Sequence, residues 1–176
     1  MSFEFQMLDI IQELRTPFLD VAMMTISGLG NAGFLWILMS LFLIIRKKTR
    51  RAGVILLLAL CMDALLCNVL LKPLVARVRP CDVNTAVELL IPHPTDKSFP
   101  SGHTAASFAA VAALYFSGEK RLWKVSLALA VWMAFSRMYL YVHYPTDVLG
   151  GAAVGGLSGY GAFLGIRYLE RLRKSE

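Results

Sequence analysis

The chain is divided into long apolar runs that are separated by short breaks, polar or rich in glycine and proline. Four runs hold about 17–21 residues each, and they cover Ala52–Leu71, Ser101–Ser117, Leu122–Val142 and Val148–Ile166. A helix needs about 20 apolar residues to cross ~30 Å of hydrocarbon. The pattern therefore predicts four membrane-spanning helices and an all-α fold.

A further apolar run, Asn31–Ile45, is too short to span a bilayer by itself. It reaches a spanning length only together with Ile26–Gly30, where Gly28 and Gly30 favour a break or bend in the helix. We expect this broken helix to be a fifth span. The predicted fold is thus an integral-membrane helical bundle with about five spanning helices.

The N-terminal segment alternates between apolar and polar side chains at short intervals. The apolar positions are Phe3, Phe5, Met7, Leu8, Ile10, Ile11 and Leu14, and the polar ones are Glu4, Gln6, Asp9, Gln12 and Glu13. This segment is too polar to span, and it has neither the basic stretch nor the uninterrupted apolar core of a secretory signal peptide. An amphipathic helix in the membrane interface fits the pattern best.

Composition supports the membrane setting. Hydrophobic residues make up 57% of the 176 positions, and the mean hydropathy is +0.59, more than a soluble surface tolerates. The length suggests a single membrane-embedded domain over residues 1–176. We expect residues 1–30 to form interfacial helices that lead into the membrane, residues 31–171 the spanning bundle, and residues 172–176 a cytoplasmic tail.

The net charge of +6 does not indicate a nucleic-acid partner, because the basic residues are clustered. Twelve of the eighteen lysines and arginines fall into three clusters, within 46–51, 120–124 and 167–174. All three emerge on one side of the predicted bundle, which the positive-inside rule assigns to the cytoplasm. The C-terminus is then cytoplasmic, and the segments 72–100 and 142–146 lie on the external face of a multi-pass plasma-membrane protein.

Three cations on this external face run against the topological rule and suit a phosphate group. Arg79 and Arg137 can offer planar bidentate forks, and Lys72 a point charge. Ser101 would be the N-cap of the third run, and Gly102 would let an oxyanion approach free backbone N–H groups at the positive end of the helix dipole. Taken alone, Lys72 is as well explained by an interfacial lysine that reaches toward water.

Two histidines and one carboxylate complete the candidate chemistry. His143 can accept a phosphoryl group if its other ring nitrogen is held, and Asp147 follows four residues later, with Pro145 suited to the first helical position. His103 would protonate the leaving oxygen and then activate water. By itself, Asp147 is better explained as an acid at a helix N-terminus, and a single interfacial histidine is usually structural.

Other polar residues are assigned no role in catalysis. We expect Arg77 to lack a protein partner and contact headgroups or solvent, and His93 to be structural. Asp63 lies mid-span, where an ionisable group suggests function, but it is nine residues before Lys72, on about the opposite face of an α-helix. A helix-packing role and a substrate-cavity role both stay open for it. The three cysteines, Cys61, Cys67 and Cys81, form no disulfide framework, and no cluster with zinc-ligand spacing is seen. No metal and no cofactor are expected.

Glycines between 150 and 159 predict close helix packing.

The order and spacing of the candidate residues resemble the tripartite signature of the type 2 phosphatidic acid phosphatase superfamily. The matching positions are Lys72 and Arg79-Pro80, then Pro100-Ser101-Gly102-His103, then Ser136-Arg137, His143 and Asp147. The resemblance implies a helical membrane bundle and metal-independent hydrolysis through a phosphohistidine on His143. It also implies that His103 protonates the leaving group, that Asp147 orients His143, and that phosphate is held by Lys72, Arg79, Ser101, Gly102 and Arg137.

The substrate class follows less directly. Members of the superfamily act on phosphatidate, phosphatidylglycerol phosphate, polyprenyl diphosphates, lipid A phosphates or sugar phosphates, and the motifs do not separate these. The compact loop between Arg79 and Pro100 leaves little room for a lid, which favours a small bacterial enzyme. Among the substrates we favour undecaprenyl diphosphate, which is recycled to undecaprenyl phosphate on the external face. The alternatives are phosphatase activity on phosphatidylglycerophosphate or phosphatidate, phosphate transfer to another lipid, and a lipid carrier or scramblase with a headgroup pocket. The oligomeric state stays open.

Overall fold

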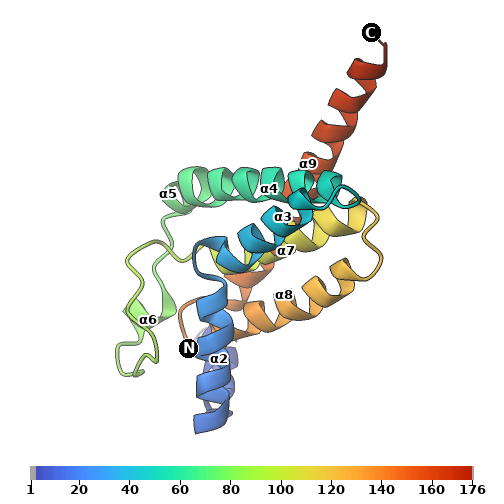
Figure 1. Ribbon diagram of the computed structural model, residues 1–176. Helices are drawn as coiled ribbons and strands as arrows, with labels where there is room; N and C mark the ends of the chain where they lie inside the picture. The colour runs from blue at the N-terminus through green and yellow to red at the C-terminus, as the bar shows by residue number, and fades with distance from the viewer. Residues whose placement is uncertain (1–2, 176) are drawn as a thin grey trace.

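The computed structural model describes residues 3–175, and Figure 1 shows their arrangement as a helical bundle, with no strand among the described residues. The all-α prediction is confirmed. The elements are α1 (Phe3–Gln12), α2 (Pro17–Leu29), the 3₁₀ turn η1 (Asn31–Gly33), α3 (Phe34–Ile45), α4 (Arg50–Ala64), the π-helix η2 (Leu65–Leu71), α5 (Lys72–Val75), α6 (Pro80–Val83), α7 (Gly102–Phe116), α8 (Leu122–Tyr139) and α9 (Pro145–Ser175).

The predicted break before α3 lies at η1. The chain bends by 49° between α2 and α3, and the backbone turns where Ala32 and Gly33 adopt φ values of 51° and 71°. Gly30 leads into this turn, whereas Gly28 lies inside α2. The left-handed conformation of Gly33 carries no Cβ penalty. The bend starts α3 beside the N-terminal end of α7.

The second predicted span is one continuous rod of α4, η2 and α5. A π-helix makes i→i+5 hydrogen bonds, so it turns through fewer degrees per residue than an α-helix. This change of register corrects the expectation for Asp63: although it lies nine residues before Lys72, both side chains line the same cavity. The sequence pattern could not show this, because the prediction from it assumed α-helical geometry along the whole segment.

Length and composition alone support fewer spans than five. Among the described residues, the segment Arg50–Val83, which contains this rod, and helix α9 are each long and apolar enough to cross a membrane, and the bent pair α2–α3 can count as a third. Helices α7 and α8 are only 15 and 18 residues long. The count of five therefore stays a prediction. Helix α9 runs on to Ser175, so residues 172–175 are helical, and Glu176 lies outside the described residues. That residues 172–176 form a cytoplasmic tail stays a prediction.

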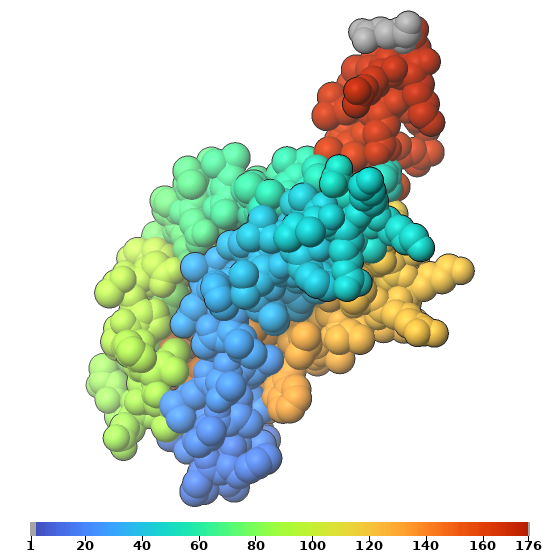
Figure 2. Space-filling view, in the orientation of Figure 1, coloured from blue at the N-terminus to red at the C-terminus, as the bar shows by residue number. Residues whose placement is uncertain are grey.

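Apolar side chains are unusually common on the outside of the bundle. Phe18 is 80% exposed, Ile45 77% and Leu157 70%. In water such a surface would associate, whereas lipid tails accept it. Figures 1 and 2 show the end of α9, which carries basic residues, standing out beyond the rest of the bundle. The surface is that of a membrane protein.

Helices α7 and α9 pack through glycine, as the sequence predicts. Gly151, Gly155 and Gly159 lie one turn apart on α9, and a Cβ at these positions would lie 2.6, 2.1 and 2.7 Å from the carbonyl oxygens of Ser101, Ala105 and Ala109. Only glycine permits this approach of the two backbones. At the N-terminal ends of the two helices, the Ser101 N–H donates a hydrogen bond to the Asp147 carbonyl oxygen at 3.0 Å.

The first prediction compares two neighbouring glycines of α9. Gly155→Ala should lower the stability by about 1–3 kcal/mol or more, because its methyl group would overlap the backbone of α7. Gly156→Ala meets nothing within 4 Å and should raise the stability by up to about 1 kcal/mol through helix propensity. Thermal unfolding of the two variants in the same detergent measures the difference. Equal midpoints would contradict the packing described here.

Candidate active site

The bundle collects most of the predicted site residues around one cavity of about 980 Å³. Six of the eight line it: Lys72, Arg79, Gly102, His103, Arg137 and His143. The other two, Ser101 and Asp147, are fully buried behind this lining. The predicted convergence of three distant segments is thus observed in the fold, while the role of each residue stays a prediction.

His143 is held in the turn between α8 and α9. The chain turns sharply at Tyr141, whose φ is 59°, and Pro145 begins α9 as the sequence predicts. The imidazole is 2% exposed; its Nε2 lies 3.2 Å from Arg79 Nη1, and its Nδ1 lies 3.6 Å from Asp147 Oδ2, an ion-pair separation rather than a hydrogen bond. Asp147 therefore faces one ring nitrogen of His143 and Arg79 the other.

These contacts define the tautomer of His143. A guanidinium has donors only, so Nε2 beside Arg79 must be the acceptor, and the proton of the neutral ring lies on Nδ1 toward Asp147. Burial lowers the pKa of His143 to about 4; Asp147 opposes this shift, and the charges of Arg79 and Arg137 add to it. The ring is consequently neutral at pH 7. The Nε2 lone pair accepts from Arg79 in this structure and can act as a nucleophile once that hydrogen bond is released.

Asp147 is anchored by several donors besides His143. The Ser98 hydroxyl donates to Oδ2 at 2.5 Å and the Tyr144 backbone N–H at 2.9 Å, while Arg77 Nη1 donates to Oδ1 at 2.7 Å. A fully buried carboxylate needs such partners to remain ionised. The position and charge of this carboxylate are thereby fixed.

The expectation that Arg77 lacks a partner is wrong. Its guanidinium donates to Asp147, to Thr146 Oγ1 at 2.6 Å and to Glu4 Oε2 at 2.5 Å, and it lies 3.9 Å from the centre of the Tyr144 ring. Arg77 thus joins helix α1 to the start of α9, beside the turn that carries His143. The sequence carried one sign of this. Arg77 lies two residues before Arg79, and residues two apart in an extended segment point to the same side, so Arg77 could have been placed near the site together with Arg79.

Arg79 is almost completely enclosed, with 3% exposure. Its Nε donates to the Asp96 carbonyl at 2.8 Å, its Nη1 to the Val142 carbonyl at 2.7 Å and to His143, and its Nη2 to Asp96 Oδ1 at 2.6 Å and to the Lys97 carbonyl at 3.4 Å. These contacts use all five guanidinium donors. Arg79 is therefore fixed in orientation between the loop before α7 and the turn that carries His143.

Asp96 is a site residue that sequence reasoning missed. Its carboxylate accepts from Lys72 Nζ as well as from Arg79, and it lines the cavity. Partial burial would raise the pKa of Asp96, but hydrogen bonds and charges from the two cations hold it at about 2. A loop acid 24 residues from Lys72 carries no local sign of this contact.

The remaining phosphate-binding candidates differ in how they are placed. Arg137 is 4% exposed, donates to Ser27 Oγ of α2, and its Nε has no hydrogen-bond partner among the described residues. Ser101 is the N-cap of α7 as predicted, but its side chain makes no cap hydrogen bond and instead accepts from Thr104. A Cβ on Gly102 would lie 3.7 Å from Lys72 Nζ, so its backbone borders the cavity.

His103 lies on the first turn of α7 against the η1 bend. Its Nε2 is 3.0 Å from Asn31 Oδ1, and a Cβ on Gly30 would approach its ring to 2.8 Å. Asn31 was not singled out from the sequence, although a polar residue beside a helix-breaking glycine in an apolar run is a usable signal. The broken helix therefore positions the candidate acid.

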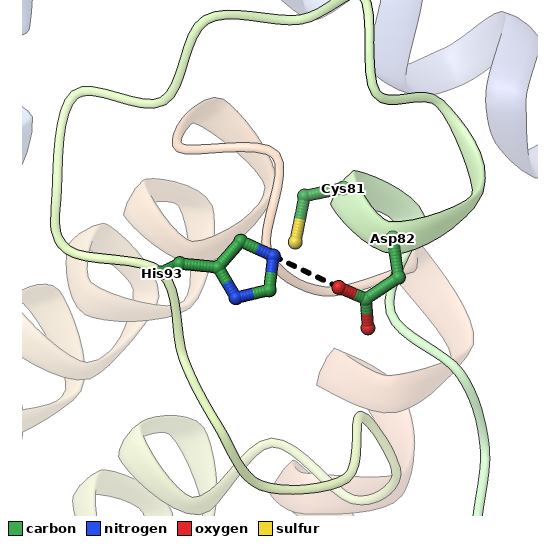
Figure 3. Close-up of side chains that lie close together, drawn as sticks. All are labelled: Cys81, Asp82 and His93. Atoms are coloured by element: carbon green, nitrogen blue, oxygen red, sulfur yellow. Dashed lines mark ion pairs between the residues drawn. The ribbon is translucent and has the colours of Figure 1, made fainter.

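A second group of polar side chains lies on the external loop outside this cavity. Figure 3 shows His93 and Asp82 as an ion pair at 2.9 Å, with the sulfur of Cys81 directed toward them. Their donor atoms lie within 4.8 Å of one another, a grouping that linear spacing did not indicate. Cys81 is buried in α6. The Asp82–His93 ion pair joins α6 to the loop segment that leads to Asp96.

The comparisons with known proteins agree with this architecture. The profile of the PAP2 superfamily matches residues 52–171, well over half of the chain. The chain belongs to the PAP2 superfamily. It is therefore a membrane lipid phosphatase by family, and the resemblance inferred from the three motifs is confirmed.

Individual relatives cover most of the chain. An undecaprenyl-diphosphatase of Sulfolobus acidocaldarius is 30% identical over 88% of this chain and 74% of its own length. The undecaprenyl-diphosphatase BcrC of Bacillus subtilis is 32% identical over 88% and 77%. Among solved structures, Aquifex aeolicus LpxE has a TM-score of 0.80 at 28% identity, covering 92% of this chain and 95% of that one. A transmembrane PAP2-type phosphatidylglycerolphosphate phosphatase from Bacillus subtilis has a TM-score of 0.73 at 31% identity over 88% and 80%.

The second prediction concerns Arg77 as a positioning residue. Arg77→Gln should lower kcat by about 10²-fold with little change in KM, because Asp147 and the turn that carries His143 lose their anchor. Removing the positive charge beside Asp147 should also raise the pKa of His143 from about 4, so the acidic limb of the kcat/KM profile should move to higher pH. Kinetics against pH on a lipid phosphate in detergent measures both effects.

Arg77→Lys is the matched control for this prediction. It keeps the charge but not the fork that joins Glu4, Thr146 and Asp147. The acidic limb should therefore stay in place while kcat falls. An Arg77→Gln enzyme with unchanged kcat and an unmoved acidic limb would show that Arg77 does not act on the site.

Proposed function

We propose that this protein hydrolyses a lipid phosphate or diphosphate at the external membrane face through a phosphohistidine on His143, with undecaprenyl diphosphate as the preferred substrate. The observation that carries the proposal is the composition of the cavity. Its lining combines the three cations Lys72, Arg79 and Arg137 with apolar side chains such as Ile37, Leu57 and Leu60. Such a cavity suits a charged headgroup with the beginning of a lipid chain attached.

The proposed chemistry has two steps. His143 Nε2 attacks the terminal phosphorus and the bond from phosphorus to the leaving oxygen breaks. His103, which enters this step in its protonated form, gives that oxygen its proton and becomes neutral. His103 then takes a proton from water, whose oxygen attacks the phosphohistidine and releases inorganic phosphate with a neutral His143. Lys72, Arg79 and Arg137 stabilise the charge on the equatorial oxygens, together with the N-terminus of α7 at Gly102.

Asp147 has an electrostatic role in this scheme. Attack makes the His143 ring positively charged in a buried turn, where an unpaired charge is costly. Asp147 lies 3.6 Å from Nδ1 and can shorten this contact as the charge develops. It thereby stabilises the intermediate and keeps the ring in the productive tautomer.

The external location is supported by the charge distribution. Arg51 pairs with Glu170 at 2.8 Å, which joins the start of α4 to the end of α9 and brings two of the basic clusters to one end of the bundle. Figure 1 shows the α5–α6 segment at the other end. With the basic end in the cytoplasm, the cavity opens on the external side.

The choice of substrate rests on the relatives that cover most of the chain. Two of them are named undecaprenyl-diphosphatase. Phosphatidylglycerophosphate is the second candidate, because the matching Bacillus subtilis structure is a phosphatidylglycerolphosphate phosphatase. The cationic side chains of the cavity suit the terminal phosphate of either lipid.

The third prediction tests the reaction and its substrate together. Undecaprenyl diphosphate, phosphatidylglycerol phosphate and phosphatidate are assayed side by side for phosphate release in detergent, with and without EDTA. We expect the highest kcat/KM on undecaprenyl diphosphate, no effect of EDTA, and no release by His143→Ala. Activity abolished by EDTA would argue against the mechanism. Lipid movement that persists in a His143→Ala, His103→Ala double variant, without hydrolysis, would identify a scramblase instead.

The fourth prediction separates the two histidines. Rapid quenching with ³²P-labelled substrate should trap an acid-labile phosphoprotein in the wild type and none in His143→Ala. With p-nitrophenyl phosphate, whose leaving group needs little protonation, His103→Ala should still form the phosphoprotein and lose it about 10²–10⁴-fold more slowly. Rapid turnover of the label in His103→Ala would remove His103 from the second step.

A further inference from the structure

The group of Cys81, Asp82 and His93 brings three metal-ligating side chains together outside the main cavity. Cys81 and Asp82 are neighbours in α6, and the loop returns to place His93 beside them (Figure 3). The thiol sulfur, a carboxylate oxygen and an imidazole nitrogen all lie within 4.8 Å of one another. The lining of the cavity includes none of these three residues. A ligand bound here is therefore separate from the proposed phosphate chemistry.

The spacing of the three donor atoms fits a single metal ion. Zinc binds thiolate sulfur at about 2.3 Å and imidazole nitrogen or carboxylate oxygen at about 2.0–2.2 Å, so its tetrahedral ligand atoms lie roughly 3.3–3.7 Å apart. His93 Nε2 and Asp82 Oδ1 are 2.9 Å apart, and the sulfur of Cys81 is directed toward both (Figure 3). The His93 side chain is 56% exposed, so small rotations of it can bring all three atoms onto one ion.

Two of the three side chains are already fixed in orientation. Asp82 Oδ2 accepts from the Arg79 N–H at 3.4 Å, while Oδ1 faces His93. Cys81 is buried in an apolar cluster with Met23 and Val142. Outer contacts of this kind hold the ligands of metal sites in place. Cys81 and Asp82 therefore have little side-chain freedom to lose when an ion binds.

The types of donor favour zinc over other common cations. Thiolate and imidazole ligands suit Zn²⁺, whereas Mg²⁺ and Ca²⁺ prefer oxygen. A thiolate, a carboxylate and a neutral imidazole also balance the charge of the ion, so the neighbouring Arg77 and Lys97 are not opposed by a net positive site. Asp82 and His93 border a hollow of about 400 Å³, which leaves room for a water molecule as the fourth ligand. Three protein ligands and one water are a common zinc arrangement.

We propose that Cys81, Asp82 and His93 form a zinc-binding site on the external side, with water as the fourth ligand. Binding displaces the proton of the thiol. The ion joins α6 to the loop segment that leads to Asp96 and stabilises the folded loop. The site goes beyond the proposed function and supplies no chemistry to the cavity. Without zinc, the Asp82–His93 ion pair holds the same two segments together, so hydrolysis does not require the ion.

The fifth prediction is that the reduced protein in detergent, without a purification tag, binds one Co²⁺ ion in place of zinc. A sulfur-to-cobalt charge-transfer band should grow to one equivalent and disappear when Zn²⁺ is added. Cys81→Ala should abolish the band. His93→Gln should weaken zinc binding about 100-fold or more, since even outer partners of a metal site are worth 10–100-fold in affinity. Cys61→Ala, which removes an exposed thiol elsewhere, is the matched control and should bind as the wild type does.

Thermal unfolding gives a second measurement that does not require a change at the buried Cys81. Zinc should raise the unfolding midpoint of the wild type and of Cys61→Ala by binding the folded state, and the same zinc concentration should leave His93→Gln unchanged. Absence of the band in the wild type would overturn the site. Equal zinc affinity in the wild type, Cys81→Ala and His93→Gln would also overturn it and would place the ion elsewhere.

The proposed function stands or falls separately. Failure of the wild type to hydrolyse any lipid phosphate would overturn that function and leave the cobalt and zinc measurements as they are. A protein that hydrolyses lipid phosphate equally well before and after EDTA, but binds no zinc, would overturn the zinc site alone.

Discussion

The close backbone contact between α7 and α9 is the constraint on which the site depends. Three glycines one turn apart let α9 approach the carbonyl oxygens of α7, and the Ser101 N–H then bonds to the Asp147 carbonyl. This contact brings the N-terminal ends of the two helices to the same height. His103 on the first turn of α7 and Asp147 on the first turn of α9 are thereby held at one end of the bundle.

Around this contact, the site is organised by buried charges that must satisfy one another. Arg77 and Arg79 lie two residues apart and serve different partners, because Arg77 binds Asp147 and Glu4 whereas Arg79 binds Asp96 and contacts His143. Each guanidinium thus bridges segments that are distant in sequence. In a poorly hydrated site an unpaired charge would be costly, so each partner fixes the position of the next. His143 remains neutral because burial and the neighbouring cations disfavour its protonated form.

The same arrangement connects the chemistry to the membrane. The bend at η1 brings Asn31 and Gly30 against His103, and the cavity continues from the cations along apolar side chains of α3 and α4. The Glu4–Arg77 pair joins the amphipathic helix α1 to the turn that carries His143. A lipid held at the interface would therefore present its headgroup to groups that are already oriented.

The amino-acid sequence by itself determined the helical class, the break before α3, the glycine face of α9 and the residues that converge on the site. These features follow from local rules of apolar run length, glycine spacing and the chemistry of a phosphate group. The tertiary structure alone decided that Asp63 shares the cavity with Lys72, that Arg77 binds Asp147, and that Asp96 lies on the two cations. The π-helix changes the helical register between Asp63 and Lys72, which a prediction from α-helical periodicity takes as regular. The ion pairs of Arg77 with Asp147 and of Asp96 with Lys72 and Arg79 join residues far apart along the chain. Their contacts depend on how helices and loops pack, which no local pattern encodes.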